Sequence, residues 1–168
     1  MSTSSQPPLK ITHILETCIY CTSLSASKDF YSNTLGLTPD FSTDRMCVYP
    51  LGSTTLLLFQ LGKTGEDIIM NNTDDKPERE RLVVPRHGPT EDLIPGLLER
   101  KEGGGLRQHF CLAVKDKDEA MEWEKYFNEK DVKVIGRMEW QRGGYSVYFE
   151  DPDGHCGEIA SRGIWGHY

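Results

Sequence analysis

The sequence lacks a long apolar stretch, an excess of basic residues and a leader-like start. Its uninterrupted apolar runs, such as Leu56 to Phe59, are far below the roughly 20 residues that a membrane-spanning helix needs. The net charge is −7 without a basic cluster, which argues against nucleic-acid binding. Met1 to Pro8 is polar and has neither the basic nor the apolar part of a secretion signal. We therefore expect a cytoplasmic protein with no membrane or nucleic-acid partner.

An even set of cysteines is also lacking. The five cysteines, without a leader, predict free thiols in a reducing compartment. Cys18 and Cys21 have the spacing of a zinc-binding pair, but they lie in a strand-like run, where residues three apart face opposite sides of a sheet. The spacing therefore does not predict a shared zinc.

The sequence does contain a repeated order of elements. In the first half, the apolar patterning predicts a strand, a helix and three strands, at Ile11 to Thr22, Ser23 to Thr34, Leu37 to Thr43, Arg45 to Pro50 and Ser53 to Leu61. The second half repeats this order, at Gln108 to Lys115, Asp116 to Glu129, Val132 to Trp140, Tyr145 to Glu150 and His155 to Ser161. The repeat predicts an α+β fold in which two βαβββ modules form a curled mixed sheet shaped as a cup.

The same repeat divides the chain into five segments. They are a disordered tail, the first module, a long loop or lid, the second module and a C-terminal tail, at residues 1–10, 11–61, 62–106, 107–161 and 162–168. The middle segment is rich in Gly, Pro and charged residues, with a helical pattern only around Asp92 to Lys101. A segment of this length with so little pattern is either a disordered insertion or a functional lid.

Aligning the two halves pairs two residues that bind metals. His109 lies seven residues before Asp116, where the second helix begins, and Glu16 lies seven residues before Ser23, where the first helix begins. Both are therefore expected at equivalent places on the first strand of their module. His13 is the alternative to Glu16 as the ligand on the first strand. It lies three residues from Glu16, so it faces the other side of the strand, and its distance from the helix start does not match that of His109.

The last strand of each module gives a second comparison. Glu158 lies four residues after Gly154, whereas the residue four after Gly52 is Leu56, so the fourth related position carries no ligand. Glu16, His109 and Glu158 then form a set of two carboxylates and one imidazole. Such a set suits Zn, Mn, Ni, Co or Fe(II) and leaves coordination positions open for water and substrate.

Two motifs match those of a known family. Asp29-Phe30-Tyr31 with Leu35-Gly36-Leu37 resembles the FY…LGL signature of the vicinal oxygen chelate superfamily. The segment Gly143 to Gly154, followed by Glu158, resembles the closing YFxDPDG…E hairpin of the same superfamily. The resemblance to this group of glyoxalases, bleomycin resistance proteins and extradiol dioxygenases covers roughly Ile11 to Ser161.

The resemblance implies paired βαβββ modules, a homodimer, and Glu16, His109 and Glu158 as metal ligands. It also implies a metal-dependent lyase or isomerase that acts on a small carbonyl or vicinal-oxygen substrate through a metal-stabilised enolate. Glu16 or Glu158 would shuttle a proton. His87 in the long loop is a candidate acid or base, and Arg142 is a candidate to hold a substrate carboxylate. For both, an exposed surface residue is the alternative.

Two other functions stay open. One is an Fe(II) ring-cleaving dioxygenase, although that branch uses two His and one carboxylate, and here the first ligand is Glu16. The other is a non-catalytic small-molecule binding or resistance protein, although that branch usually lacks metal ligands. Trp140 and Tyr148 are candidates to line an apolar pocket, with core packing as the alternative. Neither the substrate nor a use of glutathione is readable from the residues.

Overall fold

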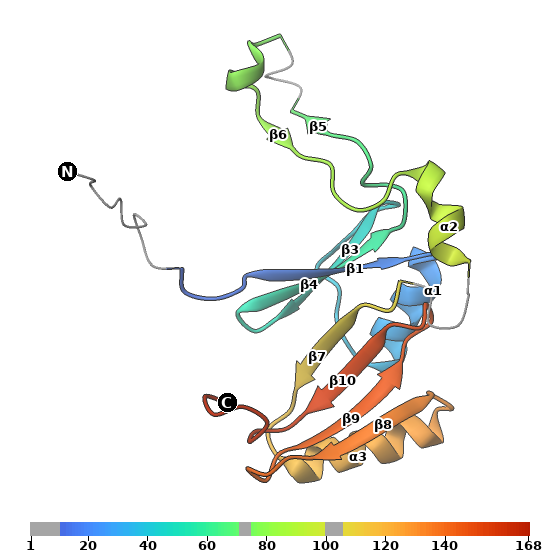
Figure 1. Cartoon of the computed structure of the whole chain (residues 1–168), viewed down its shortest axis with the longest axis vertical. Helices are drawn as coiled ribbons and strands as arrows, with labels where there is room; N and C mark the ends of the chain where they lie inside the picture. Colours follow the sequence, from blue (N-terminus) through green and yellow to red (C-terminus); the bar gives the residue numbers. More distant parts are fainter. Residues whose placement is uncertain (1–10, 71–74, 100–105) are drawn as a thin grey trace, which may run out of the picture.

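The computed structural model describes residues 11–70, 75–99 and 106–168, so the tail predicted at 1–10 lies outside the described residues. Two mixed sheets of four strands each carry the fold, with strand orders β1-β4-β3-β2 and β7-β10-β9-β8 (Figure 1). Each sheet with its helix is one βαβββ module, so the fold predicted from the repeat is confirmed. No helix in the described ranges has the length and apolar character to span a membrane.

The elements follow the predicted order with shorter bounds. The first module contains β1 (Glu16–Cys21), α1 (Leu24–Asp29), the π-helical turn η1 (Phe30–Thr34), β2 (Phe41–Ser42), β3 (Met46–Leu51) and β4 (Thr54–Gln60). The second contains β7 (His109–Ala113), α3 (Lys117–Glu129), β8 (Val134–Glu139), β9 (Tyr145–Glu150) and β10 (Cys156–Ala160). The segment between them contains β5 (Ile68–Ile69), η2 (Glu78–Glu80), β6 (Val83–Val84), η3 (Glu91–Leu93) and α2 (Ile94–Leu98).

Both module helices begin at the residues used to align the two halves. The Ser23 side chain accepts a hydrogen bond from the backbone N–H of Ala26 at 3.3 Å, and the Asp116 side chain accepts one from Glu119 at 3.1 Å. These side chains satisfy N–H groups that the first turn of a helix leaves unpaired. The alignment that related Glu16 to His109 therefore rests on two real helix starts.

The strand register corrects one detail of that alignment. Cys18 of β1 pairs with Leu57 of β4, and Cys111 of β7 pairs with Glu158 of β10. The counterpart of Glu158 is therefore Leu57 and not Leu56, because counting from the two turn glycines misplaces β4 by one residue. Leu56 lies in the core on the helix side of the sheet. The fourth position still carries no ligand.

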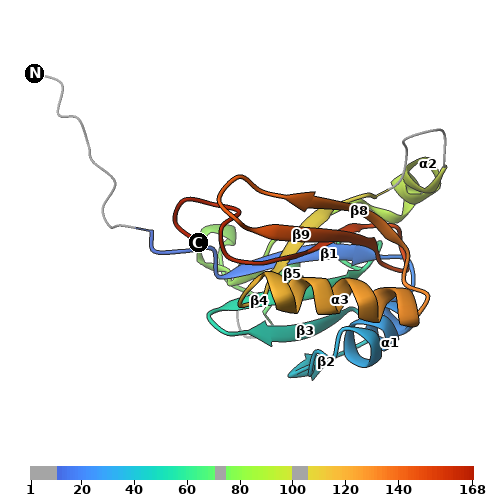
Figure 2. The same cartoon turned by 90° about the horizontal axis from the view of Figure 1, so that it is seen from below.

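The main core lies on the helix side of both sheets, so the two modules share it. Its largest fully buried side chains include Tyr31 and Tyr49 of the first module and Phe127 and Phe149 of the second. The rings of Phe127 and Phe149 are 4.7 Å apart between centroids. Figure 2 shows α1 and α3 on the same side of the molecule, where they cover this core. Burial of these aromatic rings is the main term that holds the modules together.

A smaller cluster covers the opposite face of the first sheet. Tyr20, Leu57, Phe59 and Leu61 form it, and Ile94 of α2 packs against it. The described part of the segment between the modules therefore packs on this face, and we use the name lid for it because of this position. Its β5-β6 hairpin projects from the body (Figure 1).

The turn after β9 joins the two modules through polar contacts. The Tyr31 hydroxyl donates to Oδ2 of Asp151 at 3.0 Å, and both residues are buried. The next acidic residue, Asp153, accepts hydrogen bonds from the backbone and hydroxyl of Thr22 and from the hydroxyl of Ser27. The acidic end of the hairpin motif Gly143 to Gly154 thus also ties the second module to the first helix.

Gln108 links the edge of β1 to the start of β7. Its side-chain oxygen accepts from Tyr20 N–H at 2.9 Å, and its amide nitrogen donates to the Cys18 carbonyl at 3.4 Å. The buried His155 accepts from Gln108 N–H through Nδ1 and donates through Nε2 to the Tyr20 carbonyl at 2.7 Å. Side chains therefore replace a strand ladder at this end, directly before His109.

Candidate functional site

His109 and Glu158 lie next to each other on neighbouring strands. His109 is the first residue of β7, and Glu158 lies in the middle of β10, which pairs with β7 in parallel. The distance from His109 Nε2 to Glu158 Oε2 is 3.3 Å. The Glu158 side chain is 7% exposed, whereas that of His109 is 53% exposed. The pair forms a site with a buried carboxylate and an imidazole open to a ligand.

The hydrogen bonds around His109 define its tautomer. Its Nδ1 lies 3.0 Å from the Cys156 carbonyl oxygen, which can only accept, so Nδ1 carries a hydrogen and Nε2 is the nitrogen turned to Glu158. At 3.3 Å from the Glu158 carboxylate, Nε2 can either donate a proton to it or share a bound cation with it. A carbonyl that orients the second nitrogen is the usual arrangement for a histidine that binds a metal.

The second oxygen of Glu158 supports the same interpretation. Glu158 Oε1 is buried and has no hydrogen-bond partner among the described residues. A buried carboxylate oxygen without a donor is costly, and a cation would compensate it. The imidazole nitrogen and the two carboxylate oxygens therefore fit a divalent cation such as Zn or Ni, with coordination positions left open.

Glu16 is not brought to this pair within one chain. The described residues include no group of three or more His, Cys, Asp and Glu side chains that would hold a metal ion. Glu16 is exposed at the start of β1, opposite Thr55 of β4. Ile14 and Leu15 precede it with exposures of 75% and 65%. The strand predicted to begin at Ile11 begins at Glu16, so a run of exposed apolar residues leads into the predicted ligand.

Two further side chains surround Glu158. Cys111 pairs with it from β7 and Tyr148 from β9, and the Tyr148 ring lies 6.3 Å from that of His109. Desolvation of its sulfur, followed by the charge of Glu158, raises the pKa of the Cys111 thiol to about 12. Burial and the same charge raise the pKa of Tyr148. Both groups therefore stay protonated at neutral pH and are available as hydrogen-bond donors.

His87 and Arg142 lie elsewhere in the described structure. His87 belongs to the lid, where its Nδ1 lies 2.6 Å from the Tyr20 hydroxyl and its ring packs edge-on against Phe59. Arg142 is exposed in the hairpin between β8 and β9. Within the described residues, neither forms a hydrogen bond or ion pair with the residues beside β7 and β10. Sequence reasoning did not single out Tyr20, although strand alternation places it on the face of Glu16.

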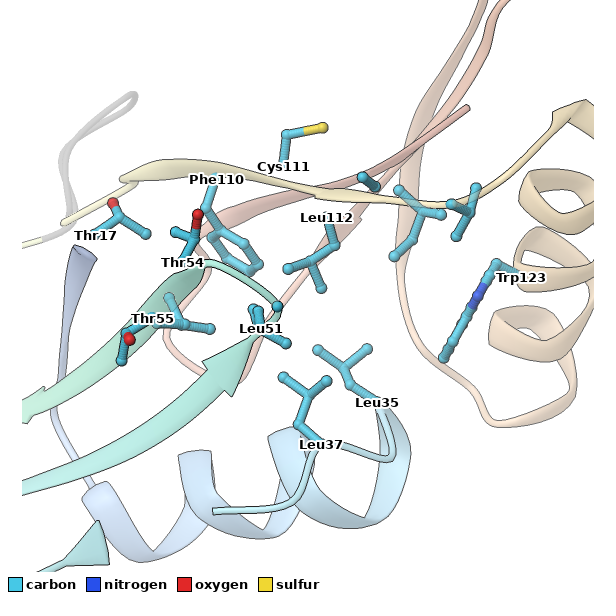
Figure 3. Close-up of a pocket in the computed structure, with 15 residues that line it drawn as sticks. Thr17, Leu35, Leu37, Leu51, Thr54, Thr55, Phe110, Cys111, Leu112 and Trp123 are labelled. Carbon is cyan, nitrogen blue, oxygen red and sulfur yellow. The ribbon is translucent and has the colours of Figure 1, made fainter. Parts of the chain in front are cut away.

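A separate apolar cavity of about 580 Å³ lies between the modules. Leu35, Leu37 and Leu51 line it from the first module, and Leu112 and Trp123 line it from the second (Figure 3). The sulfur of Cys111 points away from these side chains (Figure 3). The cavity therefore opens on the other side of β7 from His109 and Glu158.

Trp140 forms no part of this cavity lining. Its indole nitrogen donates to the hydroxyl of Ser146 at 2.8 Å, which satisfies the polar group of a half-buried ring.

Comparisons with known proteins agree with this architecture. A lactoylglutathione lyase structure from Agrobacterium tumefaciens superposes with a TM-score of 0.70 and 28% sequence identity, over 96% of this chain and 99% of that one. The fold is shared by a glyoxalase-related enzyme from Fulvimarina pelagi, with a TM-score of 0.58 and 16% identity over 92% of this chain and 91% of that one. It is also shared by a glyoxalase/bleomycin resistance protein/dioxygenase from Nocardioides, with a TM-score of 0.59 and 16% identity over 91% of this chain and 85% of that one.

No curated protein matches this chain in sequence. A family model does match, over residues 10–159, and its description is the Glyoxalase/Bleomycin resistance protein/Dioxygenase superfamily. The match spans both modules and the lid between them. The chain therefore belongs to the Glyoxalase/Bleomycin resistance protein/Dioxygenase superfamily.

Proposed function

We propose that this protein is a metal-dependent lyase or isomerase that acts on a small carbonyl compound with two neighbouring oxygens. The observation that carries the proposal is the 3.3 Å approach of His109 Nε2 to the buried Glu158 carboxylate, whose other oxygen lacks a donor among the described residues. The likeness to a lactoylglutathione lyase at 28% identity supports the reaction class.

A divalent metal, Zn, Mn, Ni, Co or Fe(II), held by His109 and Glu158 would supply a Lewis acid that polarises the substrate oxygens. We propose that Glu16 of a second copy completes the ligand set in a homodimer. The exposed Ile14 and Leu15 beside Glu16 support this, because an apolar run leading into a predicted ligand is explained by a covering partner.

The side chains around the pair would move and hold protons. Glu158 is the proposed base, since its buried carboxylate lies at the site and has an oxygen free to accept a proton. The Tyr148 hydroxyl and Cys111 thiol are donors beside it. His87 and Arg142 are the proposed contacts to substrate beyond the metal.

Metal binding by the full-length protein tests the proposal. After chelator treatment, the wild type should bind a divalent metal in calorimetry, and Glu158→Gln should weaken that binding at least tenfold, because a carboxylate ligand becomes neutral. Glu139→Gln is the control, since Glu139 lies on exposed β8 and pairs with Lys117. Unchanged binding by Glu158→Gln would reject the site.

Activity is tested separately with the metal-loaded protein. Formation of lactoylglutathione is the first assay, because that reaction class is the one supported by structural similarity. Activity that survives both chelation and Glu158→Gln would reject the mechanism. Oxygen uptake with a catechol in the iron-loaded protein would assign the site to ring cleavage instead.

A further inference from the structure

Arg45 occupies a defined place at one end of the first sheet. Its carbonyl accepts a hydrogen bond from Gln60 N–H at 2.8 Å, and its N–H donates to the Thr43 hydroxyl at 3.1 Å. The next residue, Met46, pairs with Phe59. The backbone of Arg45 is thus fixed beside the apolar cluster of Tyr20, Phe59 and their neighbours.

The buried Nε of Arg45 has no hydrogen-bond acceptor among the described residues. Within the same ranges, the side chain forms no ion pair. Two more exposed arginines do have acidic partners: Arg137 binds Glu124 at 2.5 Å, and Arg107 binds Glu150 at 3.3 Å. A half-buried guanidinium with an unpaired donor carries a desolvation cost that an anion would offset.

Two further polar side chains, those of Tyr20 and His87, lie at the same end of the first sheet. Tyr20 pairs with Phe59, and Phe59 pairs with Met46, so Tyr20 lies across the sheet from the residue that follows Arg45. Burial raises the pKa of the Tyr20 hydroxyl, and the charge of Arg45 is among the groups that oppose that rise. The Tyr20 hydroxyl is bonded to His87, and that ring packs against Phe59 at 4.8 Å between centroids. A cation, a phenol and an imidazole therefore share one end of the first sheet, above apolar side chains.

The lid is built to approach this place closely. Gly88 has a φ of +74°, which side chains other than glycine rarely adopt, and a Cβ there would lie 2.5 Å from the Tyr20 ring. Thr64 and His87, which lie before β5 and after β6, hydrogen-bond to each other. His87 is therefore held against Tyr20 by its own segment.

We propose that Arg45, with the Tyr20–His87 pair, forms a binding site for a small oxyanion, a carboxylate or a phosphate. The planar fork of a guanidinium matches either group with two parallel hydrogen bonds. Arg45 and Tyr20 lie on the first module and His87 on the segment between the modules, and none of them is assigned to the metal. The site shares His87 with the proposed substrate contacts, but oxyanion binding by the metal-free protein can be measured separately from the proposed function.

Nitrogen NMR of the metal-free full-length protein tests the site. The Arg45 Nε–H signal, assigned as the arginine signal that disappears in Arg45→Gln, should shift and saturate on titration with acetate or inorganic phosphate at constant ionic strength. Chloride should give no saturating shift. The two oxyanions distinguish a carboxylate site from a phosphate site.

Three variants control the experiment. Arg79→Gln, at an arginine whose side chain is 85% exposed, should leave the titration unchanged, and Arg45→Lys should weaken it at least fivefold because the fork is lost. Glu158→Gln should bind the oxyanion as the wild type does, which separates failure of this site from failure of the metal site. Absence of a saturating shift in the wild type with both oxyanions, or a wild-type titration in Arg45→Lys, would overturn the proposal.

Discussion

Replacing Tyr31 by Phe tests whether the turn after β9 holds the modules together. The substitution keeps the ring, so it opens no cavity, but it removes the hydroxyl that donates to Asp151 Oδ2 at 3.0 Å. Oδ1 keeps its donors, the backbone N–H groups of Asp153 and His155. Because Asp151 is only 6% exposed, water cannot readily replace the lost donor.

The expected cost is about 2 kcal/mol of unfolding free energy at pH 7, the usual value for a buried hydrogen bond to a charged acceptor. In a chain of this size that loss lowers Tm by roughly 4–8 °C. Tyr49→Phe is the matched control, because Tyr49 is equally buried but its hydroxyl bonds to the neutral Ser32 at 3.0 Å. The control should lose about 1 kcal/mol.

The pH dependence gives a second test of the same contact. Burial raises the pKa of Asp151, and the Tyr31 hydroxyl lowers it, so Tyr31→Phe should raise it further. A carboxyl with a raised folded pKa contributes stability that is present below its unfolded pKa of about 3.9 and is lost as pH rises through the folded value. The penalty of Tyr31→Phe should therefore be largest at pH 7 and shrink toward pH 4.

Urea unfolding followed by tryptophan fluorescence measures both effects between pH 7 and pH 4. The Tyr49→Phe penalty should stay nearly constant over that range, since its partner does not titrate. Equal stability of wild type and Tyr31→Phe at pH 7 would refute the importance of the contact. A penalty independent of pH would refute its link to the Asp151 charge.

Two other substitutions probe packing and the contact between modules. Gly157→Ala should lower the free energy of unfolding in urea by about 3 kcal/mol, because the added Cβ would lie 2.2 Å from the Phe149 ring. Gly96→Ala is the control and should cost nothing, because the space around Gly96 is open. Equal effects of the two substitutions would contradict the packing of Gly157 against Phe149. Gln108→Ala should lower the same free energy by about 2 kcal/mol, because it removes both side-chain hydrogen bonds to β1. An unchanged urea midpoint would show that these hydrogen bonds are dispensable.

The repeat could be predicted from sequence because each module has strong local signals. Tyr145 to Glu150 has the predicted bounds of β9, and the predicted helix start at Asp116 is its N-cap. The sequence also predicted that Cys18 and Cys21 face opposite sides of the sheet. In the structure Cys21 is buried in the main core, and Cys18 packs with the smaller cluster on the other face. Period-two alternation alone gives that result.

The remaining features depend on contacts between distant segments. The run Ile11 to Leu15 has the composition of a strand, yet the strand begins at Glu16, because strand assignment needs a neighbour as well as a composition. The β5-β6 hairpin was not predicted, because its paired strands have only two residues each. Such short strands leave no periodic pattern to detect.

The candidate site combines both kinds of information. His109 and Glu158 were predicted together from repeat positions, and they meet because parallel pairing of β7 with β10 brings them side by side. Glu16 occupies the position equivalent to His109, but equivalence in a repeat means only that two residues hold the same place in different modules. Whether they also meet depends on how the modules face each other. If Glu16 is one of the metal ligands, it reaches His109 only in the proposed homodimer. Metal affinity should therefore fall when the protein is diluted to monomers.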